Sequence, residues 1–219
     1  MPTTDDARVE SLRNHWWWRP GWRAGRHLYA CHLILDDQPE LLGLIRHYQD
    51  ALADLGNLDP IPPGSLHLTM QRIGWADDVS ADDVSAVAER IADRLRDAPV
   101  PVVSFHEATV WEEAVVLKAL PAEPIYQLRL AVYEAIAAVL GPRALPVAPP
   151  AREQFVPHVS VAYVNRDGPA QPVFDALGGT RQPPVTVTFR VAPILAFHRD
   201  HEMYEWASAL PIPIGPQPG

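Results

Sequence analysis

The sequence predicts an α+β fold in which a strand-and-helix unit occurs twice. In the first half, short apolar runs alternate with amphipathic helices, and a helix followed by a strand recurs in the second half. Two tetrapeptides mark this duplication, HLTM at residues 67–70 and HVSV at residues 158–161. Because successive side chains of a strand point to opposite faces, each histidine shares a face with the hydroxyl two residues later. The repeat therefore predicts a cleft that receives both imidazoles and both hydroxyls.

The elements of the first half follow from apolar periodicity. Apolar runs predict strands at residues 28–35 and 65–73, and two or three strands within residues 100–106 and 107–120, with a turn at Glu112 and Glu113. Apolar residues at helical spacing predict helices at residues 41–55 and 82–96. Gly56 stops the first of these helices. The strand at residues 65–73 carries the first tetrapeptide.

The second half repeats this order in shorter form. A helix is predicted at residues 126–140, a proline-rich loop at 142–150, the second motif strand at 155–164, a short helix at 172–177, and strands at 185–198 and 203–211. The resulting organisation is an arm at residues 1–27, a single domain at 28–211, and a disordered tail at 212–219.

Composition excludes several classes of protein. The chain has 219 residues, 47% of them hydrophobic, and a net charge of −9, which argues against coating nucleic acid through bulk charge. The single cysteine, Cys31, permits no internal disulfide, suits a reducing compartment and is expected to be a small core residue. Neither a membrane-spanning apolar run nor a signal peptide is evident. We therefore expect a cytoplasmic monomer with no membrane partner.

The arm has an unusual composition. Residues 11–27 contain Trp16, Trp17, Trp18 and Trp22 together with arginines and no acidic residue. Tryptophans and arginines could form a platform that stacks bases and binds phosphates. The favoured interpretation is that the tryptophans pack over the domain, because exposing so much apolar surface is costly.

The paired motifs suit proton transfer at a phosphodiester. Near neutral pH one histidine can accept a proton from water or a ribose hydroxyl while the other donates one to the departing oxygen. The hydroxyls can stabilise the charge that builds on the phosphate.

No metal or cofactor is expected, because this set lacks a carboxylate or thiolate ligand. Neither a nucleophile elbow nor a glycine-rich phosphate loop is present. A second polar cluster consists of His198, His201, Glu202 and Glu205. Its spacing differs from the HExxH spacing of zinc hydrolases.

These motifs give the chain a resemblance to the 2H phosphoesterase superfamily, within its 2′-5′ RNA ligase and cyclic phosphodiesterase branch. The resemblance rests on LHLTM at residues 66–70, PHVSV at 157–161, their HxTx-type pattern and a closing tyrosine segment at 204–211, and it covers residues 28–211. It implies two pseudo-symmetric lobes of strands and helices around a central groove. It also implies the roles of four residues: acid and base for His67 and His158, and phosphate binding for Thr69 and Ser160. Serine stands in the second motif where threonine is common, and it keeps the hydroxyl.

The resemblance implies an enzyme that opens 2′,3′-cyclic phosphates of RNA ends or nucleotides to 2′-phosphates without metal. Some members join or cleave 2′-5′ RNA linkages, and a nucleotide- or RNA-end-binding module with little catalysis is the alternative from another class. The pattern leaves open which histidine is the base. Candidates for lining the groove are Tyr29, Arg72, Tyr163 and the arm from Trp16 to Trp22, and the first three are candidates for contacting the substrate.

Overall fold

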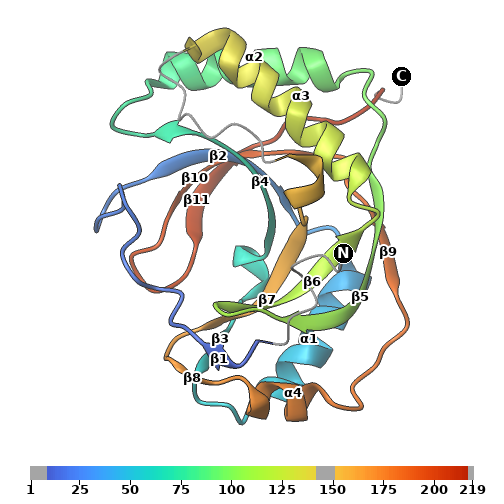
Figure 1. Cartoon of the computed structure of the whole chain (residues 1–219). Helices are drawn as coiled ribbons and strands as arrows, with labels where there is room; N and C mark the ends of the chain where they lie inside the picture. Colours follow the sequence, from blue (N-terminus) through green and yellow to red (C-terminus); the bar gives the residue numbers. More distant parts are fainter. Residues whose placement is uncertain (1–8, 142–150, 217–219) are drawn as a thin grey trace.

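The computed structural model describes residues 9–141 and 151–216, and the predicted loop at 142–150 lies outside them (Figure 1). The helices are α1 Pro39–Leu52, α2 Ala81–Leu95, α3 Glu123–Leu140 and α4 Gln171–Leu177. The strands are β1 Ser11–Leu12, β2 Leu28–Ile34, β3 Leu58–Pro60, β4 His67–Trp75, β5 Val102–Val110, β6 Ala114–Leu120, β7 His158–Val164, β8 Gly168–Pro169, β9 Val185–Thr188, β10 Ile194–His198 and β11 Glu205–Leu210.

A single β-sheet extends through both lobes. Its strand order is β11-β10-β2-β4-β7-β6-β5-β9, with β3 paired to β7 outside this path. All of its pairings are antiparallel. The first lobe contains β11, β10, β2 and β4, and the second contains β7, β6, β5 and β9. This arrangement confirms the expected α+β fold with two lobes.

Each lobe takes a helix from the other half of the chain. α3, from the second half, packs with α2 above β4, whereas α1, from the first half, packs against β7, β9 and α4 (Figure 1). The buried face of α1 carries the apolar residues expected from its spacing: Leu41, Leu44, Ile45, Tyr48 and Leu52. Because of this exchange, the lobes do not correspond to the two halves of the sequence.

The lobes meet where the two motif strands touch. Among the described residues, the ladder between β4 and β7 consists of one pair, Leu68 opposite Val159. Both side chains are fully buried in the main core. The motif residues on either side of this pair therefore project from the seam between the lobes.

Two sequence predictions about the C-terminal region are wrong. Residues 185–198 do not form one strand, because β9 lies at one edge of the sheet beside β5 and β10 lies beside β2 in the other lobe. Pro193, which has no backbone N–H to donate, precedes β10 where the chain crosses between lobes. The predicted disordered tail is also ordered in part, since Ile212 and Ile214 are buried in the main core. Residues 217–219 lie outside the described residues.

The arm crosses both lobes. β1 pairs with β8, and the backbone N–H of His15 donates to the carbonyl of Val164 in the second lobe. Further along, Trp22 packs edge-to-face on Trp75 in the first lobe, with ring centroids 4.9 Å apart. Trp16 and Trp22 are buried, as the packing interpretation expects, whereas Trp17 and Trp18 are exposed.

No helix among the described residues has the length and apolar character needed to cross a bilayer.

Candidate active site

The two motif histidines occupy equivalent positions, each as the first residue of its strand. Nδ1 of His67 lies 2.9 Å from the carbonyl oxygen of Ser65, and Nδ1 of His158 lies 2.9 Å from that of Val156. A carbonyl oxygen only accepts hydrogen bonds, so each Nδ1 carries the proton and donates it. Nε2 of each neutral ring is therefore left as the proton acceptor at the cavity that both rings line.

Both motif hydroxyls line the same cavity, whose volume is about 130 Å³. Because β4 and β7 run antiparallel through the pair Leu68–Val159, Thr69 lies toward His158, and His67 lies toward Ser160. Thr69 is exposed and Ser160 is buried. The strands thus bring together the four residues that the sequence singled out.

Aromatic rings hold both imidazoles in place. His67 stacks on His32 with centroids 5.2 Å apart and an interplanar angle of 11°, and Tyr204 and Trp206 meet it edge-on. His158 packs against Trp111 at 4.4 Å. These contacts restrict the ring orientations that the Nδ1 hydrogen bonds already define.

Burial keeps the imidazoles of the site neutral. It is the main cause that lowers the pKa of His67 to about 4, and the neighbouring His158 lowers this pKa further against the opposing hydrogen bond to Ser65. Burial also lowers the pKa of His158. The pKa of His15 falls to about 3, first through burial and then through the charge of Arg19, and burial places that of His32 well below its usual value.

We expect the protein to lose stability in mild acid. An unfolded histidine binds a proton near pH 6.5, whereas these buried rings stay neutral until much lower pH. The unfolded state therefore binds more protons, and the free energy of unfolding rises with pH from about 4 to about 6.5 and then levels off. His15 and His32 are each less than a tenth exposed and should each contribute about 1.4 kcal/mol per pH unit.

Urea titrations at pH 7.0 and 5.5 would measure this slope above the range in which unfolded carboxylates titrate. The variant His15→Gln should have a shallower slope than the wild type, and a variant of the exposed His106, His106→Gln, should not. Equal unfolding midpoints at the two pH values would contradict the assignment of neutral, buried imidazoles.

The arm, the strand β2 and the C-terminal hairpin supply five further cavity residues. These are His15, Trp22, His32, Phe197 and Tyr204. Nε2 of His15 lies 3.2 Å from the Tyr204 hydroxyl, and the His15 ring stacks on Tyr163 at 4.2 Å. Two of the five carried a sequence signal. Trp22 belongs to the tryptophan-rich arm, and Tyr204 begins the closing segment that supports the family resemblance.

The candidate substrate-contacting residues divide into two groups. Arg72 and Tyr163 line the cavity, as expected. Tyr29 does not belong to the lining and instead packs, partly buried, against the main core. Side-chain alternation along β2 places Tyr29, with Cys31 and Leu33, on the face of the main core, and His32 on the opposite face, where it lines the cavity. Cys31 is a buried core residue, and burial raises the pKa of its thiol to about 12.

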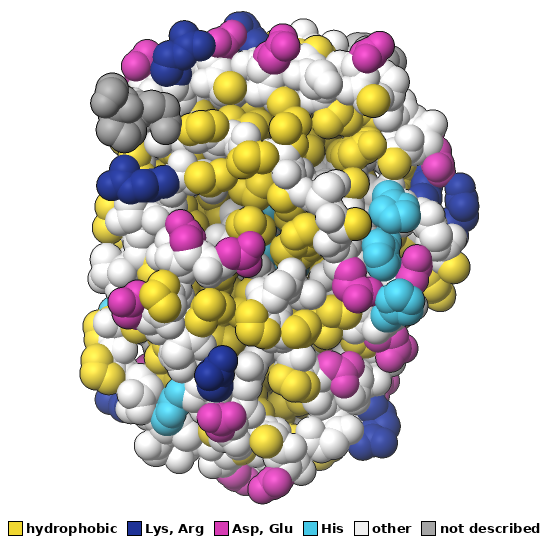
Figure 2. All heavy atoms as spheres, turned by 180° about the vertical axis from the view of Figure 1, so that it is seen from behind, with side chains coloured by type: hydrophobic (Ala, Val, Ile, Leu, Met, Phe, Trp, Pro, Cys, Tyr) yellow, Lys and Arg dark blue, Asp and Glu magenta, His cyan; other side chains and the backbone are white. Residues whose placement is uncertain are grey.

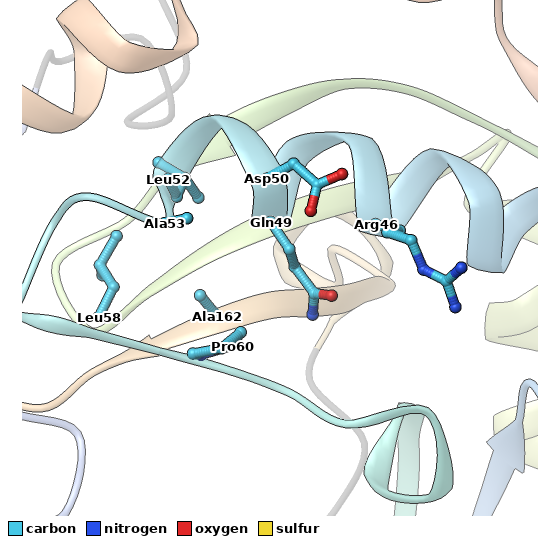
Figure 3. Close-up of a pocket in the computed structure, with 8 residues that line it drawn as sticks. All are labelled: Arg46, Gln49, Asp50, Leu52, Ala53, Leu58, Pro60 and Ala162. Carbon is cyan, nitrogen blue, oxygen red and sulfur yellow. The ribbon is translucent and has the colours of Figure 1, made fainter.

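A larger cavity of about 400 Å³ lies between α1 and the strands β3 and β7 (Figure 3). Its lining is mostly apolar, and the Gln49 side chain that points from α1 toward the strands already donates to the carbonyls of Ile61 and Val161. The described lining residues include no imidazole or hydroxyl group. By volume alone this cavity would be the candidate active site. The smaller cavity is the better candidate, because it contains the side chains that acid–base chemistry needs.

Comparison with known proteins decides the family. The sequence profile described as the 2′-5′ RNA ligase superfamily matches residues 38–201, about three quarters of the chain. The chain belongs to this superfamily. A search of curated proteins gives no match to it.

Several solved structures share the fold of this chain. TT0787 of Thermus thermophilus is 16% identical with a TM-score of 0.61, and the alignment covers 84% of this chain and 97% of that protein. Escherichia coli LigT complexed with phosphate is 18% identical with a TM-score of 0.57, covering 88% and 99%. A structure described as a phosphoesterase is 19% identical with a TM-score of 0.59, covering 87% and 99%.

The superfamily match ends short of several cavity residues. It begins after β2 and stops before Tyr204, so His15, Trp22 and His32 also lie outside it. This member therefore builds part of its cavity wall from chain that the superfamily profile does not describe.

Proposed function

We propose that this member of the 2′-5′ RNA ligase superfamily is a metal-independent phosphodiesterase that opens 2′,3′-cyclic phosphates to 2′-phosphates. The observation that carries the proposal is the matched pair of imidazoles, each with Nδ1 bonded to a carbonyl and Nε2 left for the cavity. Such a pair can accept one proton and donate another on the two sides of one phosphorus atom.

In the proposed reaction, a water oxygen attacks phosphorus and the bond from phosphorus to the 3′ oxygen breaks. The neutral histidine takes a proton from the water, and the protonated histidine gives its proton to the departing 3′ oxygen. The product carries a 2′-phosphate and a free 3′-hydroxyl, so the reaction consumes one water without an oxidant or a metal. The proposal assigns these roles to His67 and His158 as a pair.

Thr69 and Ser160 are proposed to bind the non-bridging phosphate oxygens. Each hydroxyl lies on the same strand as a histidine, so strand geometry fixes the distance between the imidazole that transfers a proton and the hydroxyl that binds a phosphate oxygen. Arg72 lines the same cavity and adds a cation that stabilises the charge of the transition state. In support, LigT is described in complexes with phosphate and with 3′-AMP.

RNA ligation at 2′-5′ linkages is a second candidate, favoured by the superfamily match itself. In that reaction a 5′-hydroxyl replaces water as the nucleophile on the cyclic phosphate, and the same two histidines move the protons. The two activities therefore share one site and differ in which nucleophile reaches the phosphorus.

Turnover in the presence of excess chelator tests the proposal. Purified protein should convert 2′,3′-cyclic nucleotides, or RNA ending in a 2′,3′-cyclic phosphate, to 2′-phosphates, as read by phosphorus NMR. An RNA with a 5′-hydroxyl end, added to the same mixture, reports ligation. Absence of turnover with every base, or a 3′-phosphate product, would contradict the proposed function, and binding of RNA ends without turnover would favour the binding-module alternative.

A further inference from the structure

The hairpin of β10 and β11 brings three metal-ligating side chains together outside the cavity. His198, the last residue of β10, is the register partner of Glu205, the first residue of β11. Directly opposed residues of an antiparallel pair hold their Cβ atoms about 5 Å apart. The connecting loop bends back through Glu202, whose φ is 51°, and carries His201 over the same end of the hairpin. The backbone therefore sets this arrangement.

The ligand atoms are close enough to share one ion. One nitrogen of His198, one of His201 and a carboxylate oxygen of Glu205 all lie within 4.8 Å of one another. Nδ1 of His201 is already 2.6 Å from a carboxylate oxygen of Glu205. A tetrahedral ion with ligands at about 2.0–2.1 Å needs donor atoms about 3.3 Å apart. The side chains of His201 and Glu205 are substantially exposed, so small rotations bring the donors to that spacing.

The surroundings of this cluster favour a cation. A carboxylate oxygen of Asp200 lies 3.5 Å from Nδ1 of His198, and the ring of His27 packs 5.1 Å from that of His198. Figure 2 shows histidine side chains grouped beside acidic ones on the face opposite that of Figure 1. Carboxylates next to an imidazole cluster produce a negative local potential that attracts a divalent ion.

We propose that His198, His201 and Glu205 bind a divalent first-row transition metal, for which Zn²⁺ is the best-fitting ion. Two imidazoles and one carboxylate are ligands that Zn²⁺ accepts, with water in the fourth position, and imidazole ligands exclude Mg²⁺ and Ca²⁺ as preferred occupants. The spacing of these residues in sequence matches no zinc motif, because it is the strand register that assembles them.

This metal site is separate from the proposed catalysis. None of its three ligands belongs to the lining of the cavity of His67 and His158. The same hairpin does carry Phe197 and Tyr204, which line that cavity. Binding of the ion would therefore tie the two strands together just behind the cavity wall without contacting the reacting phosphate.

Isothermal titration of the full chain with ZnCl₂ tests the proposal. We expect one ion per chain, and we expect His198→Ala and His201→Ala each to weaken binding by at least about tenfold. His106→Ala, which removes an exposed histidine elsewhere, is the matched control and should bind as the wild type does. The melting temperature of the wild type should rise with Zn²⁺, and that of His201→Ala should not.

The catalytic histidines provide the decisive comparison. The double variant His67→Ala/His158→Ala should retain the titrated zinc site, although its activity is lost if the proposed function is right. Zinc binding that disappears in this double variant and persists in His201→Ala would overturn the proposal. So would a dissociation constant unchanged by both His198→Ala and His201→Ala, since the cluster would then be only a hydrogen-bonded surface pair.

Discussion

His67→Ala and His158→Ala are each expected to lower kcat/KM for a 2′,3′-cyclic nucleotide by at least ~100-fold. Each substitution removes the Nε2 acceptor that faces the cavity while leaving the strand hydrogen bonds in place. Because the two rings act on the same transition state, the double variant should be little worse than the poorer single variant. Steady-state kinetics measure the loss, and circular dichroism and thermal melting check that each variant is folded.

His106→Ala serves as the matched histidine control for activity and should turn over as the wild type does, because its side chain is exposed and lies outside the cavity lining. The pH dependence adds a second readout. One histidine must be neutral and the other protonated, and burial lowers the pKa of both, so the kcat/KM profile should be bell-shaped with its optimum below pH 6.5. Full turnover in either alanine variant would refute histidine acid–base catalysis.

Trp16→Ala is expected to lower the free energy of unfolding by about 3–5 kcal/mol. Trp16 is 7% exposed and packs against Tyr163 and Tyr204, while the guanidinium of Arg199 lies 5.2 Å from its ring. Removing the indole leaves a void beside the cavity wall and exposes the buried Arg199. Because Tyr204 loses a neighbour, kcat/KM should fall as well.

Trp18→Ala is the matched control in the same segment. Trp18 is 54% exposed, so its removal should change stability by only about 0.5 kcal/mol. Chemical denaturation of the two variants measures the difference. The affinity of the variants for RNA ends distinguishes the two interpretations of the arm. A base-stacking platform requires Trp17 and Trp18 to contribute to this affinity, whereas a packed arm does not. Equal destabilisation by the two substitutions would contradict the packing of Trp16 against the domain.

The sequence was informative where local pattern determines structure. The motif strands, the helices and their order are predictable, because strand alternation and helical spacing leave a direct record in the chain. α2, for example, begins at a Ser80 capping box and buries Val87, Ile91 and Leu95 at helical spacing. His67 shares a face with Thr69, and His158 shares a face with Ser160, for the same reason.

Features that depend on contacts between distant segments could not be predicted from the local sequence pattern. The exchange of α1 and α3 between lobes depends on packing across the whole sheet, and the separation of β9 from β10 depends on where the chain crosses. His15 reaches the site only because the arm folds back over both lobes. These positions are set by tertiary contacts between distant segments.

The meeting of His15 with Tyr204 has a consequence for the order of assembly. The two residues are 189 positions apart, and Arg199, which donates to the His15 carbonyl, is 184 positions away from it. The arm is synthesised well before Arg199 and Tyr204, on which it docks. Contacts of such large sequence separation close late in folding because loop closure must precede them. The strands that carry the two motif histidines are therefore available before the wall of their cavity is, and a nascent chain completes the pocket only when the arm has met the hairpin of β10 and β11.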